Sequence, residues 1–251
     1  ATPGHPHEDR NVDPAEIARF NALAEEWWKP DGAFKMVHAF NRARVGHIAT
    51  RLAALIGREA TSETPLTGLK IIDVGCGAGI VAEPLSWLGA DVLGIDAAER
   101  NVAVADAHAR RSGARVRYRH ALASDCVAEF GTFDVVLSLE VVEHVADLDA
   151  FLGDLAKLVR PGGLVVIGTL NRTMRSYVKA IIGAEYVLGW LPKGTHDWRK
   201  FVMPDELERR FAALGVRKIE ASGVIYHAVT RRWSIGRDVS MNYLQIHRRD
   251  G

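Results

Sequence analysis

A glycine-rich loop with the sequence DVGCGAG occupies residues 73–79 and is the clearest candidate for chemistry in the chain. Glycines let the backbone turn sharply and approach a ligand closely. Dinucleotide sites favour the spacing G-x-G-x-x-G, whereas Gly75, Gly77 and Gly79 follow Asp73 with the spacing G-x-G-x-G. A carboxylate at this place repels a pyrophosphate and attracts a ligand with an ammonium and a sulfonium group. A nicotinamide site and a tight turn without a ligand are the alternatives.

Asp96 is a second candidate, because it directly follows the apolar run at residues 91–95. In nucleotide-binding sheets of this kind, a carboxylate at the end of the second strand accepts the hydroxyls of a ribose. The loop and Asp96 together predict a site for a cofactor with a nucleoside part.

A third candidate is the turn with Glu140, Glu143 and His144, which follows the apolar run at residues 133–139. In a helical turn, Glu140 shares one face with Glu143 and with His144. Two carboxylates and an imidazole can hold a divalent cation. The same side chains could instead provide a general base without metal, or only pack. The general base would then be Glu140 or His144.

The elements that must position these residues follow from alternating short apolar runs and amphipathic helices. Continuously apolar runs indicate strands buried on both faces of a parallel sheet. Such runs lie at residues 69–74, 91–95, 116–118, 133–139 and 164–170, and two further strands are expected at 216–225 and 239–247. One helix is expected to begin after Asp147, and the last to begin at Pro204 and stop at Gly215. The pattern predicts an α/β, doubly wound sheet.

Composition suits a single globular core. The chain has 251 residues, 48% of them hydrophobic, and a net charge of +1, which gives no argument for a nucleic-acid partner. Two cysteines imply no disulfide framework and fit a reducing cytoplasm. We interpret residues 1–13 as a mobile tail, residues 14–58 as an N-terminal helical cap, and residues 69–248 as the core.

Residues 172–200 form an insertion in that core with its own composition. Aromatic and aliphatic side chains accompany six basic and two acidic ones. Aromatic residues beside cations are typical of a segment that lies at a membrane interface. A lid that packs over the protein's own active site is the alternative.

The order of motifs resembles that of class I S-adenosylmethionine-dependent methyltransferases. The resemblance rests on residues 73–79, Asp96, FDVV at 133–136 and LVRPGG at 158–163. It implies a Rossmann-like, seven-stranded, mostly parallel sheet with an antiparallel last strand, and S-adenosylmethionine as the cofactor.

A narrower resemblance, to the UbiG family, covers nearly the whole chain after Val12. It rests on FNALAEEWWKPDG at residues 20–32, FK at 34–35, His38, NRAR at 41–44, TLNR at 169–172 and GTHDW at 194–198. UbiG proteins catalyse the O-methylations of ubiquinone biosynthesis on polyprenylated phenol and catechol rings. By the resemblance, the cofactor contacts fall on Arg44, Gly75, Asp96 and Leu139, with Leu122 beside the adenine and Arg44 at the methionine carboxylate.

The resemblance also implies Mg²⁺ at Glu140, Glu143 and His144. The partners that the resemblance implies are a polyprenyl phenol or quinol substrate, other ubiquinone-biosynthesis proteins, and the membrane through residues 172–200. The expected location is therefore cytoplasmic and peripheral to the inner membrane. A class I methyltransferase for another phenolic or lipid-like acceptor is the first alternative. A membrane-associated binding protein that keeps the fold without turnover is the second.

Overall fold

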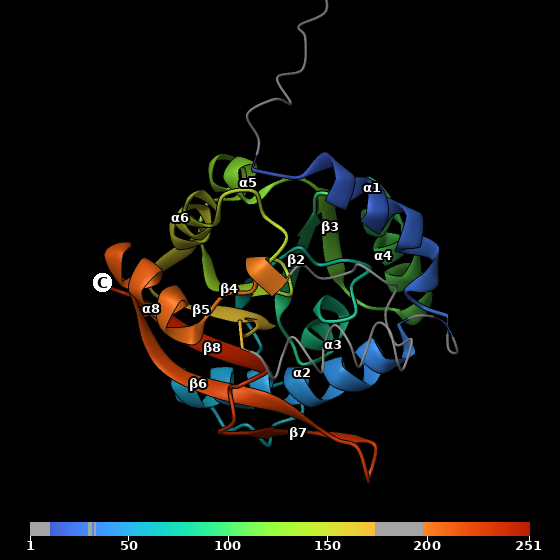
Figure 1. Cartoon of the computed structure of the whole chain (residues 1–251). Helices are drawn as coiled ribbons and strands as arrows, with labels where there is room; N and C mark the ends of the chain where they lie inside the picture. Colours follow the sequence, from blue (N-terminus) through green and yellow to red (C-terminus); the bar gives the residue numbers. More distant parts are fainter. Residues whose placement is uncertain (1–10, 30–31, 33, 174–197) are drawn as a thin grey trace, which may run out of the picture.

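The computed structural model describes residues 11–29, 32, 34–173 and 198–251. Its centre is one sheet with the strand order β3-β2-β1-β4-β5-β8-β6-β7 (Figure 1). The strands are β1 (Lys70–Val74), β2 (Asp91–Asp96), β3 (Val116–His120), β4 (Phe133–Leu139), β5 (Val159–Leu170), β6 (Val216–His227), β7 (Arg232–Gly236) and β8 (Asn242–Arg249). The first five strands pair in parallel, and β8 runs antiparallel between β5 and β6.

The central strands are buried on both faces, as their continuous apolar runs predict. Neighbouring residues of β1 belong to different clusters: Ile71 packs into one core and Ile72 into the other. Val135 and Val136 of β4 divide in the same way. Successive side chains of a strand point to opposite faces, so both faces of the sheet need a helical cover.

Helices supply that cover on each side (Figure 1). Side chains from α2 (Lys35–Leu55), α3 (Ala82–Trp87) and α4 (Glu99–Ser112) join the core that holds Ile71. Those from α5 (Ala123–Phe130), α6 (Leu148–Leu158) and α8 (Pro204–Ala213) join the core that holds Ile72. The result is the predicted three-layer α/β architecture.

Local signals set the helix ends where the sequence places them. The Asp147 side chain accepts a hydrogen bond of 3.1 Å from the amide of Ala150 at the start of α6. Pro204 opens α8, with Asp205 and Glu206 in its first turn, and Gly215 follows with a positive φ of 71°. These caps confirm both predicted helix starts.

The sheet has one strand more than the predicted seven. The added strand is β7, which pairs antiparallel with β6 at the edge of the sheet. It is short and half-buried, and Trp233 and Ile235 pack against the core that contains Phe40 of α2. A five-residue edge strand with only two inward side chains lacks the apolar run by which the other strands were predicted.

The N-terminal helices lie against α4, at the edge of the sheet that contains β3 (Figure 1). They are α1 (Pro14–Leu23) and the 3-10 turn η1 (Ala24–Glu26). Residues 1–10 of the predicted tail lie outside the described residues. Asn11 exchanges two hydrogen bonds with the backbone of Asp147, and Asp13 caps α1. The described end of the predicted tail is thus bound to the core.

Most of the predicted insertion, residues 174–197, lies outside the described residues. Its two flanks meet, because the indole nitrogen of Trp198 donates to the carbonyl oxygen of Thr173 at 3.0 Å. Among the residues that are described, no helix has the length and apolarity needed to cross a membrane.

Candidate active site

The glycine loop joins β1 to α3 at the carboxyl ends of the parallel strands, where such sheets bind ligands. The amides of Gly75 and Cys76 both donate to the carbonyl of Ile95, at 2.8 and 2.9 Å. The loop is therefore fastened to the end of β2 by backbone hydrogen bonds. Gly75, Gly77 and Gly79 all have positive φ values, of 77°, 54° and 86°.

Each of the three glycines also faces a side chain of the protein itself. A Cβ atom on Gly75 would lie 2.3 Å from Val141, and one on Gly79 would lie 2.1 Å from the hydroxyl of Tyr118. A Cβ on Gly77 would lie 3.2 Å from the ring of Trp27. Glycine is required here by backbone conformation and by tight internal packing together.

Asp96 ends β2 beside this loop and is held by backbone donors. Its carboxylate accepts from the amides of Gly77 and Ala98, both at 2.8 Å, and from the Asn101 side chain at 3.3 Å. Burial raises the pKa of Asp96, and the two amide donors oppose that rise. A carboxylate oxygen accepts more than one hydrogen bond, so Asp96 keeps the capacity to accept from ribose hydroxyls.

The two predicted leucines border the same edge of the sheet. Leu139 ends β4 and is 7% exposed. Leu122 precedes α5, and the neighbouring Ala121 donates its amide to the carbonyl of Asp96 at 3.3 Å. Leu139 and Leu122 thus lie at, or two residues beyond, the carboxyl ends of β4 and β3.

Arg44 comes from α2 and lies buried, 3% exposed, at the ends of β4 and β5. Its guanidinium donates to Glu140 at 2.7 Å and stacks over Phe40 at 4.3 Å. Burial lowers the pKa of Arg44, while Glu140 and Asp73 act in the opposite direction. Burial also raises the pKa of Asp73 to about 7. No described residue hydrogen-bonds to Asp73 Oδ2, which is buried.

These groups fit S-adenosylmethionine. The unpartnered oxygen of Asp73 can accept from an ammonium group, Arg44 can donate to a carboxylate, and Asp96 can accept from ribose hydroxyls.

The predicted helical turn after β4 is wrong. Glu140 has a left-handed φ of 59°, and its amide donates to the carbonyl of Gly168 at 2.8 Å. The amide of His144 donates to the carbonyl of Val141 at 2.8 Å, so a single hydrogen-bonded turn replaces the helix. The three side chains therefore do not share a helix face.

Each of these three side chains has its own partner. Glu140 pairs with Arg44 at 2.7 Å, and buried Glu143 accepts from the hydroxyl of Thr169 at 2.8 Å. The Nδ1 atom of His144 lies 2.9 Å from Glu16 of α1. Burial raises the pKa of Glu143, and the charge of Glu140 adds to that effect.

The donor set as arranged does not fit a metal ion. Among residues 11–29, 32, 34–173 and 198–251, no three His, Cys, Asp or Glu side chains converge closely enough to hold one. The expected Mg²⁺ ligands Glu140, Glu143 and His144 point to α2, β5 and α1 respectively.

Sequence reasoning missed several side chains that surround the loop. Trp27 and Trp28 reach it from the cap, and Glu16 reaches His144. The adjacent tryptophans were a usable signal, because two large aromatic rings beside a turn need a surface to cover. Nothing in the local sequence marks Glu16, which sits on an ordinary amphipathic helix.

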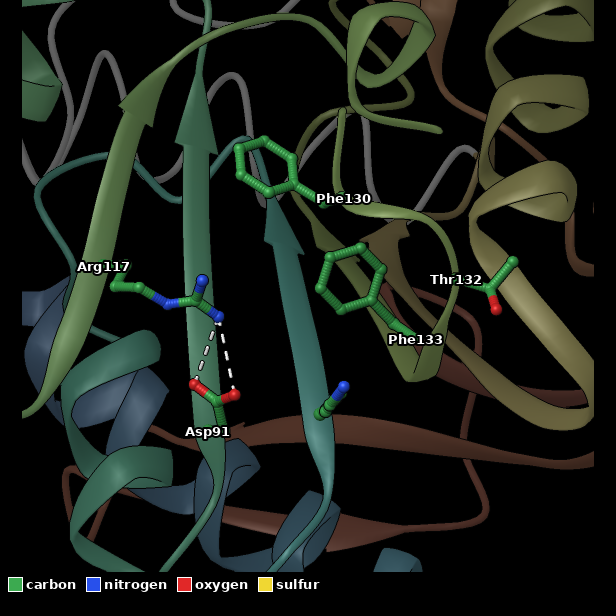
Figure 2. Close-up of a pocket in the computed structure, with 6 residues that line it drawn as sticks. Asp91, Arg117, Phe130, Thr132 and Phe133 are labelled. Carbon is green, nitrogen blue, oxygen red and sulfur yellow. Dashed lines mark hydrogen bonds and ion pairs between the residues drawn. The ribbon is translucent and has the colours of Figure 1, made fainter. Parts of the chain in front are cut away.

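A pocket of about 310 Å³ lies elsewhere, at the amino ends of the strands. Figure 2 shows its lining, with Asp91 at the start of β2 paired to Arg117 of β3. Phe133 lines it at the start of β4. This edge is opposite to the glycine loop, and ligands of parallel sheets bind at the carboxyl ends. We therefore assign the cofactor to the loop and not to this pocket.

Comparison with known proteins agrees with this geometry. The family model described as a methyltransferase domain matches residues 44–221. The ubiquinone biosynthesis O-methyltransferase of Parvibaculum lavamentivorans is 47% identical over 239 residues, which cover 95% of this chain and 94% of that protein. The enzyme of the same name from Roseobacter denitrificans is 49% identical over 234 residues, covering 93% and 94%. The chain belongs to the family of ubiquinone biosynthesis O-methyltransferases.

This methyltransferase also has solved structural neighbours. The magnesium protoporphyrin IX methyltransferase of Synechocystis PCC 6803, solved with bound SAH, superposes with a TM-score of 0.63. It is 19% identical, and the match covers 93% of this chain and 95% of that one. The likeness confirms the predicted class I fold.

Proposed function

We propose that this methyltransferase moves the methyl group of S-adenosylmethionine to a ring hydroxyl of a polyprenylated phenol or catechol. The products are S-adenosylhomocysteine, an aryl methyl ether and one proton. The reactions correspond to those of a 2-polyprenyl-6-hydroxyphenol methylase and a 3-demethylubiquinol 3-O-methyltransferase. The observation that carries this proposal is the 47–49% identity, over more than nine tenths of the chain, to relatives named for ubiquinone biosynthesis.

The cofactor half of the site is supplied by Arg44, Asp73 and Asp96. They bind the carboxylate, the ammonium group and the ribose, so the sulfonium lies near the end of β4. Methyl transfer is then an in-line displacement, and its rate depends mainly on holding the acceptor oxygen and the methyl carbon in line. Leu122 and Leu139 border the nucleoside side of this site, and apolar walls there limit the access of water.

The proton of the acceptor hydroxyl needs a base, and His144 is the candidate that the contacts favour. Its Nδ1 atom lies 2.9 Å from a carboxylate oxygen of Glu16. A carboxylate beside an imidazole stabilises the imidazolium that forms when the other ring nitrogen takes a proton. Glu140 is the second candidate, but it already neutralises Arg44.

An assay of methyl transfer tests the proposed acceptor. The purified protein, S-adenosylmethionine and a short-tailed demethylubiquinol are expected to give the methylated quinol, measured by mass spectrometry. His144→Gln is expected to lower kcat by about a hundredfold, the usual range for a general base. Absence of the methylated product with the wild-type protein, although S-adenosylmethionine binds, would reject the acceptor and keep the cofactor.

Mg²⁺ at Glu140, Glu143 and His144 stays a prediction of the family resemblance. Binding the ion there requires the Arg44–Glu140 pair to open and His144 to leave Glu16. The same assay with EDTA decides the matter. Full activity in EDTA would reject the metal, and activity restored by added Mg²⁺ would support it.

Membrane contact through residues 172–200 is a further part of the proposal, because a polyprenyl substrate resides in the bilayer. It is supported by the basic and aromatic composition of that segment. It places the enzyme on the cytoplasmic face of the inner membrane, where other ubiquinone-biosynthesis proteins could meet it. Co-sedimentation with anionic liposomes is expected for the wild type and not for a deletion of residues 181–191. Equal binding by both would reject the contact.

A further inference from the structure

Trp27 joins the N-terminal cap to the ribose side of the cofactor site. Its ring stacks on Phe34 at 4.0 Å and lies against Gly77. Its indole nitrogen donates to the side-chain oxygen of Asn101 at 3.1 Å. Asn101 is 2% exposed and donates in turn to Asp96 at 3.3 Å. The cap thereby reaches the carboxylate that we assign to the ribose through one buried amide.

Trp28 joins the cap to the loop itself. Its indole nitrogen donates to the carbonyl of Ala78 at 2.9 Å. Its ring stacks face to face on the imidazole of His108, with centroids 3.4 Å apart and planes 1° from parallel. Ala78 lies between Gly77 and Gly79, two of the three loop glycines with positive φ, so Trp28 binds the loop directly.

The imidazole of His108 is itself fixed by a buried carboxylate. His108 Nδ1 lies 2.8 Å from Oε1 of Glu83, a residue with no exposed surface. The hydroxyl of Ser112 donates to the other oxygen, Oε2, at 2.8 Å. An ionised carboxylate only accepts, so Nδ1 carries the proton and the ring orientation is set. Burying a carboxylate is costly unless it is fully paired, and this pairing holds the ring that receives Trp28.

We propose that Trp27 and Trp28 are a latch that fastens the cap over bound S-adenosylmethionine, and that Asn101, His108 and Glu83 are positioning residues of the cofactor site. One branch of the latch ends at Asp96, and the other at the carbonyl of Ala78. Cofactor exchange then requires α1, η1 and the two tryptophans to move away from the loop while α2 stays in the core, and the latch sets the dissociation rate of the cofactor. The inference rests on cofactor binding at the loop.

Trp28→Ala tests the second branch, with Trp87→Ala as the matched control. Trp87 lies on α3, the helix that carries Glu83, but its side chain is 52% exposed. Loss of the stack and of one hydrogen bond is expected to raise both the Kd and the KM for S-adenosylmethionine by about five- to a hundredfold. The KM for the phenolic acceptor and kcat are expected to change much less.

A series of further variants separates an effect on the position of the loop from a loss of folding. Trp28→Phe keeps the stack on His108 and loses the bond to Ala78, so its affinity is expected to lie between those of wild type and Trp28→Ala. In the double variant of Trp28→Ala with His108→Ala, the two losses are expected to overlap and not to add, because both break the same stack. Asn101→Ala is expected to weaken cofactor binding through Asp96 without changing the effect of Trp28→Ala.

Limited proteolysis measures directly how accessible the cap is with and without a bound ligand. Trypsin cleaves after Arg19 of α1 and after Lys35 at the start of α2, on either side of the latch in the chain. S-adenosylhomocysteine is expected to protect these bonds in the wild type and in Trp87→Ala, and not in Trp28→Ala. Equal protection and equal affinity in a folded Trp28→Ala protein would overturn the latch. If that variant does not fold, Trp28→Phe and His108→Ala carry the same test. A wild type that does not bind the cofactor would overturn the proposed function instead.

Discussion

The glycine loop and the acidic turn follow neighbouring strands, β1 and β4, yet only the loop has the local geometry predicted for it. The loop is set by backbone features: three positive φ angles and two amide bonds to the carbonyl of Ile95. The acidic turn is set by side chains, and Arg44, Thr169 and Glu16 each bind a different one of its residues. The residues of a loop themselves determine its backbone conformation, whereas the partners of long charged side chains come from distant elements.

The two regions also differ in what holds their carboxylates. Asp96 accepts from the backbone amide of Ala98, two positions further along the chain, and from that of Gly77 in the neighbouring loop. Glu140 depends on an arginine 96 positions earlier in the chain. Four changes test the comparison: one breaks the loop, and three probe the charged groups around it.

Gly79→Ala is expected to have the largest effect. Its Cβ would lie 2.1 Å from the hydroxyl of Tyr118 at a φ of 86°, so we expect a loss of about 2–5 kcal/mol in the free energy of unfolding. Gly113→Ala is the matched control, with a φ of 75° and open space around it, and should lose only about 1–2 kcal/mol. Urea denaturation measures both. Equal losses would show that packing against Tyr118 does not matter.

Asp96→Ala is expected to weaken S-adenosylmethionine binding by about 1–3 kcal/mol, the range for losing the partner of buried hydroxyls. Isothermal calorimetry measures the change. Asp91→Ala is a control, because Asp91 starts the same strand at the far edge of the sheet, where it pairs with Arg117. An unchanged affinity in Asp96→Ala would contradict the ribose assignment.

Cofactor affinity is expected to fall about tenfold from pH 8 to pH 6, because burial raises the pKa of Asp73 to about 7 and the ammonium group needs the ionised form. The stability of the unliganded protein is expected to change with pH in the opposite direction. Its folded state binds the Asp73 proton more tightly than the unfolded chain does, so its stability falls as pH rises from about 3.8 to about 7.

Asp73→Asn is expected to flatten both pH profiles, while Asp134→Asn should leave the calorimetric profile of cofactor binding unaltered. Asp134 lies at the other end of the strands, and its pKa is lowered by the Lys70 amide and Arg160 against the effect of burial. A pH-dependent affinity that persists in Asp73→Asn would assign the titration to another group.

Glu140→Gln is expected to have the smallest effect on binding, and in the direction of tighter binding. It releases Arg44 for the carboxylate of the cofactor, which we expect to increase affinity by about two- to tenfold. Calorimetry measures the cofactor affinity, and a turnover assay measures kcat. A catalytic role of Glu140 lowers kcat, whereas a role in cofactor binding alone changes only the affinity. Weaker binding would show that Glu140 orients Arg44 and does not compete with the cofactor.

Much of the fold, and the position of Asp96 beside the glycine loop, was predictable from sequence. The apolar runs located five strands, two further strands were expected at residues 216–225 and 239–247, and the caps at Asp147 and Pro204 were correct. These signals act over a few residues. The strand β7 was missed, since Trp233 and Ile235 acquire an inward face only through α2. The shared face of Glu140, Glu143 and His144 was wrong, because it assumed a helix where Glu140 has a left-handed backbone.

The sequence alone determined the α/β order of elements, the glycine loop and the position of Asp96 beside it. Each depends on the local periodicity of apolar residues or on glycine at positions where side chains do not fit. The tertiary structure decided the rest: Arg44 meets Glu140, Glu16 meets His144, and Trp27 and Trp28 cover the loop. These contacts join segments tens of positions apart, so only the packing of the cap and α2 against the sheet brings them together.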